Sequence, residues 1–201
     1  MRLRLKYPER TLYRFDSDSI NRKDRSLEPL IISFGTDDPK YSSCLAQLNS
    51  DLELTGQLFD TTSITKGDSR FINRLKPSFI KIKLLSKKTT ILWVDCDSRV
   101  KAPLYLPGGD WDVGTLALGP AHARSVAAAD CIAFSPTNNT VKFLELWDFL
   151  CLLNRGGVSG HHEMLFALEL MKGEISVIDI KQQMKGPFLR GKLGGEAVEI
   201  E

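Results

Sequence analysis

The chain has 201 residues, of which 42% are hydrophobic, which suits one domain with a buried core and excludes a disordered chain. Lys and Arg number 27 against 25 Asp and Glu, and the formal net charge of +2 gives no reason to propose a nucleic-acid partner. No apolar run is long enough to span a bilayer, and no apolar signal segment follows the basic start. We therefore expect a cytoplasmic protein without a transmembrane segment.

Residues 1–29 are predicted to form a basic extension before a single domain over residues 30–201. The extension is polar, and only residues 12–15 suit a short strand. A solvated face or arm is the favoured interpretation, and a contact with a membrane surface or with an acidic partner is the weaker alternative. The cysteines form no C-x-x-C pair and lie in apolar stretches, which predicts buried, reduced thiols and no zinc site. They are Cys44, Cys96, Cys131 and Cys151.

Strands and helices alternate through the first half of the chain. Compact apolar runs predict buried strands, and apolar residues at helical spacing predict helices. Residues 89–94, Thr-Thr-Ile-Leu-Trp-Val, are the clearest strand because they are continuous and β-favouring. The other expected elements are a strand at 30–34, a helix from Tyr41 that ends at Gly56, a strand at 58–64, a polar loop at 66–74 and a helix with Pro77 in its first turn.

The second half begins with proline- and glycine-rich loops and then returns to regular elements. Strands are expected at 111–118, 131–134 and 176–180, and helices at 141–153 and 161–171. Asn138, Asn139 or Thr140 is expected to open the first of these helices. A glycine-rich loop is expected at 155–160 and an irregular tail after 180. The alternation of strands and helices favours a three-layer α/β/α fold with a mostly parallel central sheet.

The pattern Asp-x-Asp occurs three times, at Asp16/Asp18, Asp95/Asp97 and Asp110/Asp112. Only the middle pair follows a long buried strand, and ligands of such sheets collect beyond the carboxyl ends of the strands. Mg²⁺ and Mn²⁺ prefer carboxylate oxygens, and a site for them typically combines one or two carboxylates with substrate phosphate oxygens. The alternative is a strand-end turn that Asp merely stabilises, and spacing alone does not choose between the two.

A longer set of motifs resembles the GT-A nucleotide-diphospho-sugar transferases. The set consists of Phe-Gly-Thr-Asp-Asp-Pro-Lys-Tyr at 34–41, Lys-Pro-Ser-Phe-Ile at 76–80 and Ile-Leu-Trp-Val-Asp-Cys-Asp at 91–97. The resemblance covers about residues 30–170. It implies a GT-A fold and a metal-dependent glycosyltransferase of the hexosyltransferase type. Such an enzyme moves a sugar from a nucleotide-diphosphate donor to a hydroxyl acceptor and uses Mn²⁺ or Mg²⁺.

The same resemblance implies roles for particular residues in the donor site. Phe34, Gly35 and Thr36 would border the base and ribose, although a plain strand-to-helix turn explains them equally. Asp95 would contact the ribose or the metal, and Asp97 would be the firmer metal ligand. The residues that would line the donor and diphosphate pocket are Asp68, Asn73 and Lys76, with Lys192 from a basic, glycine-rich tail.

Catalytic roles are implied at two further places. Asp112 would hydrogen-bond the donor sugar. At 159–165 the sequence departs from the family, because His161 stands where relatives often carry an acidic residue. His161 or Glu163 would act as the base on the acceptor hydroxyl, or His161 would bind the metal, while a helix start with polar residues is an equal alternative.

Two other functions compete with glycosyl transfer. One is a haloacid-dehalogenase-like phosphotransferase with Asp95 as nucleophile, although that motif normally opens its domain and here some ninety residues precede it. The other is a GT-A domain that binds sugar nucleotides without catalysis, which the altered residues 159–165 keep open.

Overall fold

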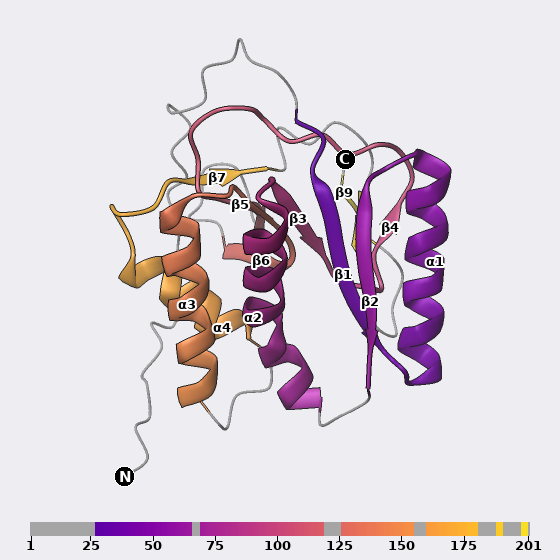
Figure 1. Ribbon diagram of the computed structural model, residues 1–201, viewed down its shortest axis with the longest axis horizontal. Helices are drawn as coiled ribbons and strands as arrows, with labels where there is room; N and C mark the ends of the chain where they lie inside the picture. The colour runs from indigo at the N-terminus through magenta and orange to yellow at the C-terminus, as the bar shows by residue number, and fades with distance from the viewer. Residues whose placement is uncertain are drawn as a thin grey trace.

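The computed structural model describes residues 27–65, 69–118, 126–154, 160–180, 188–190 and 198–200. Its centre is a six-stranded sheet in the order β2-β1-β3-β6-β5-β7 (Figure 1). Neighbouring strands are parallel except at β6, which is antiparallel to β3 and β5. The predicted α/β class with a mostly parallel sheet is confirmed. The strands are β1 Leu30–Thr36, β2 Phe59–Ile64, β3 Ile91–Val94, β5 Val113–Leu118, β6 Val126–Phe134 and β7 Val177–Asp179.

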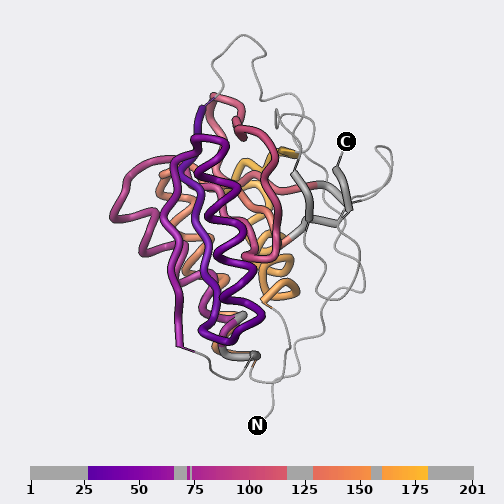
Figure 2. The backbone as a smooth tube through the Cα atoms, turned by 90° about the vertical axis from the view of Figure 1, so that its right-hand side faces the viewer, coloured from indigo at the N-terminus to yellow at the C-terminus, as the bar shows by residue number. Residues whose placement is uncertain are grey.

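Helices cover both faces of this sheet. Helix α1 (Pro39–Thr55) lies on one face, and α2 (Ser69–Lys87), α3 (Asn138–Leu153) and α4 (His161–Leu170) lie on the other (Figure 1). Successive side chains of a strand face opposite sides, so β3 contributes Trp93 to the core beneath α2 and α3, and Leu92 to the core beneath α1. Figure 2 looks onto α1 and shows the segment after residue 100 running beside it.

Helix α1 ends at Gly56 as its sequence predicts, and it begins at Pro39, two residues before the expected Tyr41. The Asp38 side chain accepts a hydrogen bond from the Lys40 amide at 3.0 Å, which caps the first turn. Gly56 ends the helix with φ 68°, a left-handed conformation that glycine adopts without steric cost.

Helix α2 differs from the expectation at its start. The helix begins at Ser69, so most of the predicted polar loop is helical and Pro77 lies inside the helix. Proline removes one helical hydrogen bond, but Ile72 and Leu75 recur at helical spacing and pack against the core with Phe79. Burial of this apolar stripe outweighs the cost of the interior proline.

The second half holds two smaller corrections. The cap of α3 is Thr137, whose hydroxyl accepts from the Thr140 amide at 3.1 Å, and not one of the three residues proposed. The tail contains two short strands, β8 (Phe188–Arg190) and β9 (Val198–Ile200), where an irregular segment was expected. They form a second sheet with β4 (Arg99–Val100), in the order β4-β8-β9.

The last residues assigned to the basic extension belong to the folded body. Leu27 and Leu106 exchange backbone hydrogen bonds of 2.8 and 2.9 Å, and Pro29 is buried. The short strand expected at 12–15 lies outside the described residues. All four cysteines are free; three are buried as predicted, and Cys44 is partly exposed. Among the described helices none is long and apolar enough to cross a membrane.

Candidate functional site

The candidate site lies at the carboxyl end of β3, beside the carboxyl ends of the parallel strands β1 and β2. Here the chain leaves β3 at Asp95 and turns through Cys96 and Asp97. The Asp95 amide donates to the Asp130 carbonyl at 2.9 Å, and the Ser98 amide donates to the Asp95 carbonyl at 3.0 Å. These bonds fix the backbone from which both carboxylates project.

Asp95 is held by two donors on one oxygen. Lys76 Nζ lies 2.7 Å and Trp93 Nε1 lies 2.8 Å from Asp95 Oδ1. Lys76 also donates to the Ala129 carbonyl at 3.0 Å, and its ammonium lies 5.0 Å from the centre of the Trp93 ring. The described residues donate no hydrogen bond to Asp95 Oδ2, and 36% of the side chain is exposed, so this oxygen remains available to a ligand.

Asp97 lies in a more negative environment. Burial raises the pKa of its carboxyl, the charge of Asp95 raises it further, and Asp130 adds to the effect against the opposing charge of Lys76. The field of Asp97 also helps to raise the pKa of Tyr41 and of Cys44 on α1, in both cases after burial as the main cause. The turn after β3 therefore carries a concentration of negative charge that a cation would neutralise.

The donor set suits a hard divalent ion in chemistry but does not form a complete protein cage. Among the described residues no group of three or more His, Cys, Asp or Glu side chains is arranged to hold a metal ion. Asp95 and Asp97 supply carboxylate oxygens only, which matches sites where substrate phosphates complete the coordination. Asp95 and Asp97 could therefore supply the protein's part of a metal site that a substrate completes.

The residues predicted to border the base and ribose lie on β1, beside this turn. Phe34 is 8% exposed, and its ring packs edge-on against Phe79 at 5.2 Å and Trp93 at 5.0 Å. Gly35 lies against α1, where an added Cβ would be 3.0 Å from the Tyr41 carbonyl. Thr36 is buried at the strand end. The structure gives the first two a packing role, and a role in donor binding stays a prediction.

Of the other residues predicted for the donor pocket, the structure describes only one. Asn73 lies in α2, one turn before Lys76. Asp68 and Lys192 lie outside the described residues.

The start of α4 reaches the same end of the molecule through a chain of contacts. Arg74, two residues before Lys76, donates to the Asn154 carbonyl at 2.6 Å, and the Asn154 amide group donates to Glu163. Glu163 is 2% exposed, whereas His161 is partly exposed on the first turn. The structure therefore brings His161 and Glu163 to the end of the fold where Asp95 lies.

Asp112 lies at the opposite end of the strands from Asp95. The register aligns Val113 with Phe134 and Phe134 with Ile91, so Asp112 lies level with the start of β3 and not with its end. Both of its carboxylate oxygens accept internal hydrogen bonds, from the Thr137 hydroxyl and from the Ser176 amide. The structure does not bring Asp112 together with Asp95, and the observed contacts give it the role of joining α3 and β7 to β5.

Two residues of the site carried no assigned role at the sequence level. Trp93 belongs to the strand before Asp95, and nothing in the sequence marks its indole as a partner of Asp95. Asp130 lies at the head of the strand expected from 131, and only the antiparallel pairing of β6 with β3 brings it to Asp95 and Asp97. Since strand direction cannot be seen in a short apolar run, the sequence offered no signal for Asp130.

Similarity to known proteins is found in the structure and not in the sequence. No family model matches the chain, and no curated protein sequence is significantly similar to it. Among solved structures, a glycosyltransferase involved in the glycosylation of the major capsid of PBCV-1 matches with a TM-score of 0.52 and 13% identity, over 76% of this chain and 82% of that one. The glycosyltransferase GlyE of Streptococcus pneumoniae TIGR4 matches with a TM-score of 0.46 and 13% identity, over 77% of this chain and 46% of that one.

The match to the first of these glycosyltransferases covers most of both chains, so the two proteins share a fold. At 13% identity that likeness shows the fold alone.

Proposed function

We propose that this chain is a metal-dependent glycosyltransferase of the hexosyltransferase type, with a GT-A fold, which moves a sugar from a nucleotide-diphosphate donor to a hydroxyl acceptor. The observation that carries the proposal is the fixed carboxylate of Asp95, paired with Lys76 and Trp93 beside Asp97 in the turn after β3. The shared fold with a glycosyltransferase supports it.

Asp97, together with Oδ2 of Asp95, is the proposed ligand pair for Mn²⁺ or Mg²⁺. When bound, the ion would act as a Lewis acid and stabilise negative charge on the departing diphosphate. Lys76 would place a positive charge beside the same phosphates, because its ammonium is already held at Asp95. In this proposal His161 serves the acceptor side and is not a metal ligand.

His161 is the better candidate for the base that accepts the proton of the acceptor hydroxyl. A general base must come within hydrogen-bond reach of that proton. Glu163 is 2% exposed and is bonded to Asn154, whereas His161 is partly exposed at the start of α4. Glu163 would then act through Asn154 to hold the first turn of α4, which carries His161, in place.

The test is binding of a panel of nucleoside diphosphates with and without Mn²⁺, measured by calorimetry. We expect at least one diphosphate to bind only with Mn²⁺, and Asp97→Asn to weaken that binding by about tenfold or more. Asp60→Asn, which removes an ion pair on β2, is the matched control and should bind normally. If no diphosphate binds, or if Asp97→Asn binds as the wild type does, the proposal is wrong.

Two further measurements separate this function from its alternatives. A phosphotransferase would form a stable beryllofluoride adduct at Asp95, as a mimic of the aspartyl phosphate. A binding domain without catalysis would retain Mn²⁺-dependent affinity for nucleotide sugars and release no nucleoside diphosphate from any of them, with or without an acceptor.

A further inference from the structure

Helix α1 carries a buried carboxylate at Asp51. Asp51 is 6% exposed and lies between Leu48 and Leu52, both fully buried in the core beneath α1. A carboxylate buried without partners costs several kcal/mol, so a helix normally places Asp on its solvated side. The position of Asp51 therefore depends on what it binds.

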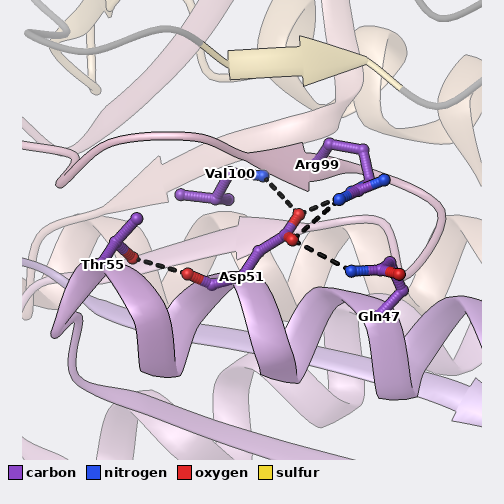
Figure 3. Close-up of polar contacts among 5 residues, drawn as sticks. All are labelled: Gln47, Asp51, Thr55, Arg99 and Val100. Atoms are coloured by element: carbon purple, nitrogen blue, oxygen red, sulfur yellow. Dashed lines mark hydrogen bonds and ion pairs between the residues drawn. The ribbon is translucent and has the colours of Figure 1, made fainter.

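Its partners come chiefly from the segment that leaves the candidate site (Figure 3). Arg99 donates from Nε to Asp51 Oδ2 at 2.6 Å and from Nη2 to Oδ1 at 2.9 Å, the paired geometry of a guanidinium on a carboxylate. The Val100 amide donates to Oδ2 at 3.1 Å, and Gln47 Nε2 donates to Oδ1 at 3.1 Å. Three of these four bonds hold two consecutive residues of β4.

Those two residues follow the carboxylate turn, residues 95–98, which carries Asp95 and Asp97. On its upstream side the turn is fixed by the bond from the Asp95 amide to Asp130, and on its downstream side by the bonds from Arg99 and Val100 to Asp51. Asp97 lies between these two fixed points, so its place depends on both.

The same two residues also hold the C-terminal strands. Arg99 pairs with Leu189 and Val100 with Phe188 in β8, and β8 pairs with β9. Asp51 is thus the point at which α1, the carboxylate turn and the second sheet are joined.

We propose that Asp51 is a positioning residue, which acts through Arg99 and Val100 to hold Asp97 in its cation-binding place and to hold β8 beside the site. This inference rests on the proposed function for its ligand, and on the hydrogen bonds of Figure 3 for its geometry. An alternative is that Asp51 only stabilises the fold, in which case its loss would lower stability and leave binding unchanged.

The experiment compares Asp51→Asn and Arg99→Ala with the wild type in Mn²⁺-dependent nucleoside-diphosphate binding and in amide hydrogen exchange without ligand. Loss of a residue that orients a metal ligand typically weakens metal affinity 10- to 100-fold, and we expect an effect of about that size in both variants. Exchange at residues 96–100 and 188–190 should become faster in both. Asp60→Asn removes the ion pairs with Lys83 and Lys87 on β2, two strands away from β3 in the sheet, and should change neither.

Each outcome decides the proposal. Normal binding and normal exchange in folded Asp51→Asn and Arg99→Ala proteins would overturn it, and so would normal binding with lower thermal stability. If Asp51→Asn does not fold, Arg99→Ala decides, because the Arg99 side chain is 46% exposed and its loss removes no buried apolar group, while Val100 and Gln47 still donate to Asp51. If the wild type binds no diphosphate, the proposed function fails, and the exchange measurement alone shows whether Asp51 holds the turn.

Discussion

At the scale of single residues, the site depends on which carboxylate oxygen of Asp95 accepts the internal hydrogen bonds. Lys76 and Trp93 both donate to Asp95 Oδ1, and this leaves Oδ2 as the oxygen that can meet a ligand. Lys76 fixes the carboxylate, and in the proposed function it would also place a positive charge beside the diphosphate. Asp97 lacks such a cationic partner among the described residues, which makes it the carboxylate that gains most from a bound ion.

Lys76→Met tests whether this lysine anchors the carboxylate. The substitution keeps the aliphatic stem but removes the Lys76 ammonium from Asp95 and from the Ala129 carbonyl. We expect a loss of about 1–3 kcal/mol in the free energy of unfolding, measured in urea. Lys81→Met is the control, because Lys81 lies 3.9 Å from an exposed Glu145 and should cost less than about 1 kcal/mol. Equal losses in the two variants would show that the Lys76 pair is not an anchor.

At the scale of elements, the packing of α1 on β1 sets where the candidate site opens. Gly35 has no side chain, and this lets the backbone of α1 approach the strand at Tyr41 and Leu45. A Cβ at this position would lie 3.0 Å from the Tyr41 carbonyl and 3.1 Å from the Leu45 Cβ. The glycine therefore determines the distance between the two elements.

Gly35→Ala should push α1 away from the sheet. Backbone and Cβ atoms cannot rotate aside, so we expect a cost of about 1–3 kcal/mol in the free energy of unfolding. The first turn of α1 carries Tyr41, and its amide exchange should rise as well. Ser43→Ala, at an exposed position of the same helix, should change stability by no more than about 0.5 kcal/mol. A wild-type stability for Gly35→Ala would show that the helix moves at no cost.

Local patterns predicted most elements but not the contacts between them. The strand before Asp95 and the helix that ends at Gly56 follow from burial, spacing and capping, which are local properties. The start of α2 does not follow from the sequence, because Pro77 suits a first turn equally well, and only the packing of Ile72 and Leu75 shows that the helix begins earlier. The Asp51–Arg99 pair joins residues 48 positions apart, so no local pattern contains it.

The same reason explains which site residues could be predicted. Asp95 and Asp97 are neighbours in sequence and follow one strand, so the motif alone places them together. The resemblance groups Asp112 with them, but the register of β5 against β6 places it at the opposite end of the strands.

At the scale of the whole molecule, three carboxyl groups with shifted pKa values make the stability depend on pH. Burial alone raises the pKa of Asp51, but the hydrogen bonds from Arg99, Val100 and Gln47 outweigh it, so the pKa is lowered. Hydrogen bonding to Lys83 is the main cause that lowers the pKa of Asp60, against burial, and Lys87 adds to it. Asp97 behaves in the opposite way, because burial and then the charge of Asp95 raise its pKa.

These pKa values predict opposite effects of acid. A lowered pKa contributes stability that is present above the unfolded value of about 3.9 and is lost as the pH falls through the folded value. The wild type should therefore lose stability below about pH 4, and Asp51→Asn and Asp60→Asn should each lose less of it, because each variant lacks one of the carboxylates whose protonation destabilises the fold. Asp97 contributes stability only at low pH, and this contribution is lost as the pH rises. Asp97→Asn should consequently gain stability relative to the wild type between about pH 4 and pH 7, without metal.

Urea unfolding of the four proteins between about pH 3 and pH 7 measures both effects in one set of curves. The difference between wild type and Asp51→Asn should shrink as the pH falls, and the difference between Asp97→Asn and wild type should grow as the pH rises. Parallel curves for Asp51→Asn and wild type would show that the charge of Asp51 does not contribute to folding. A falling curve for Asp97→Asn relative to wild type would show that Asp97 is stabilised in the folded chain without a cation, which removes the electrostatic reason for placing one there.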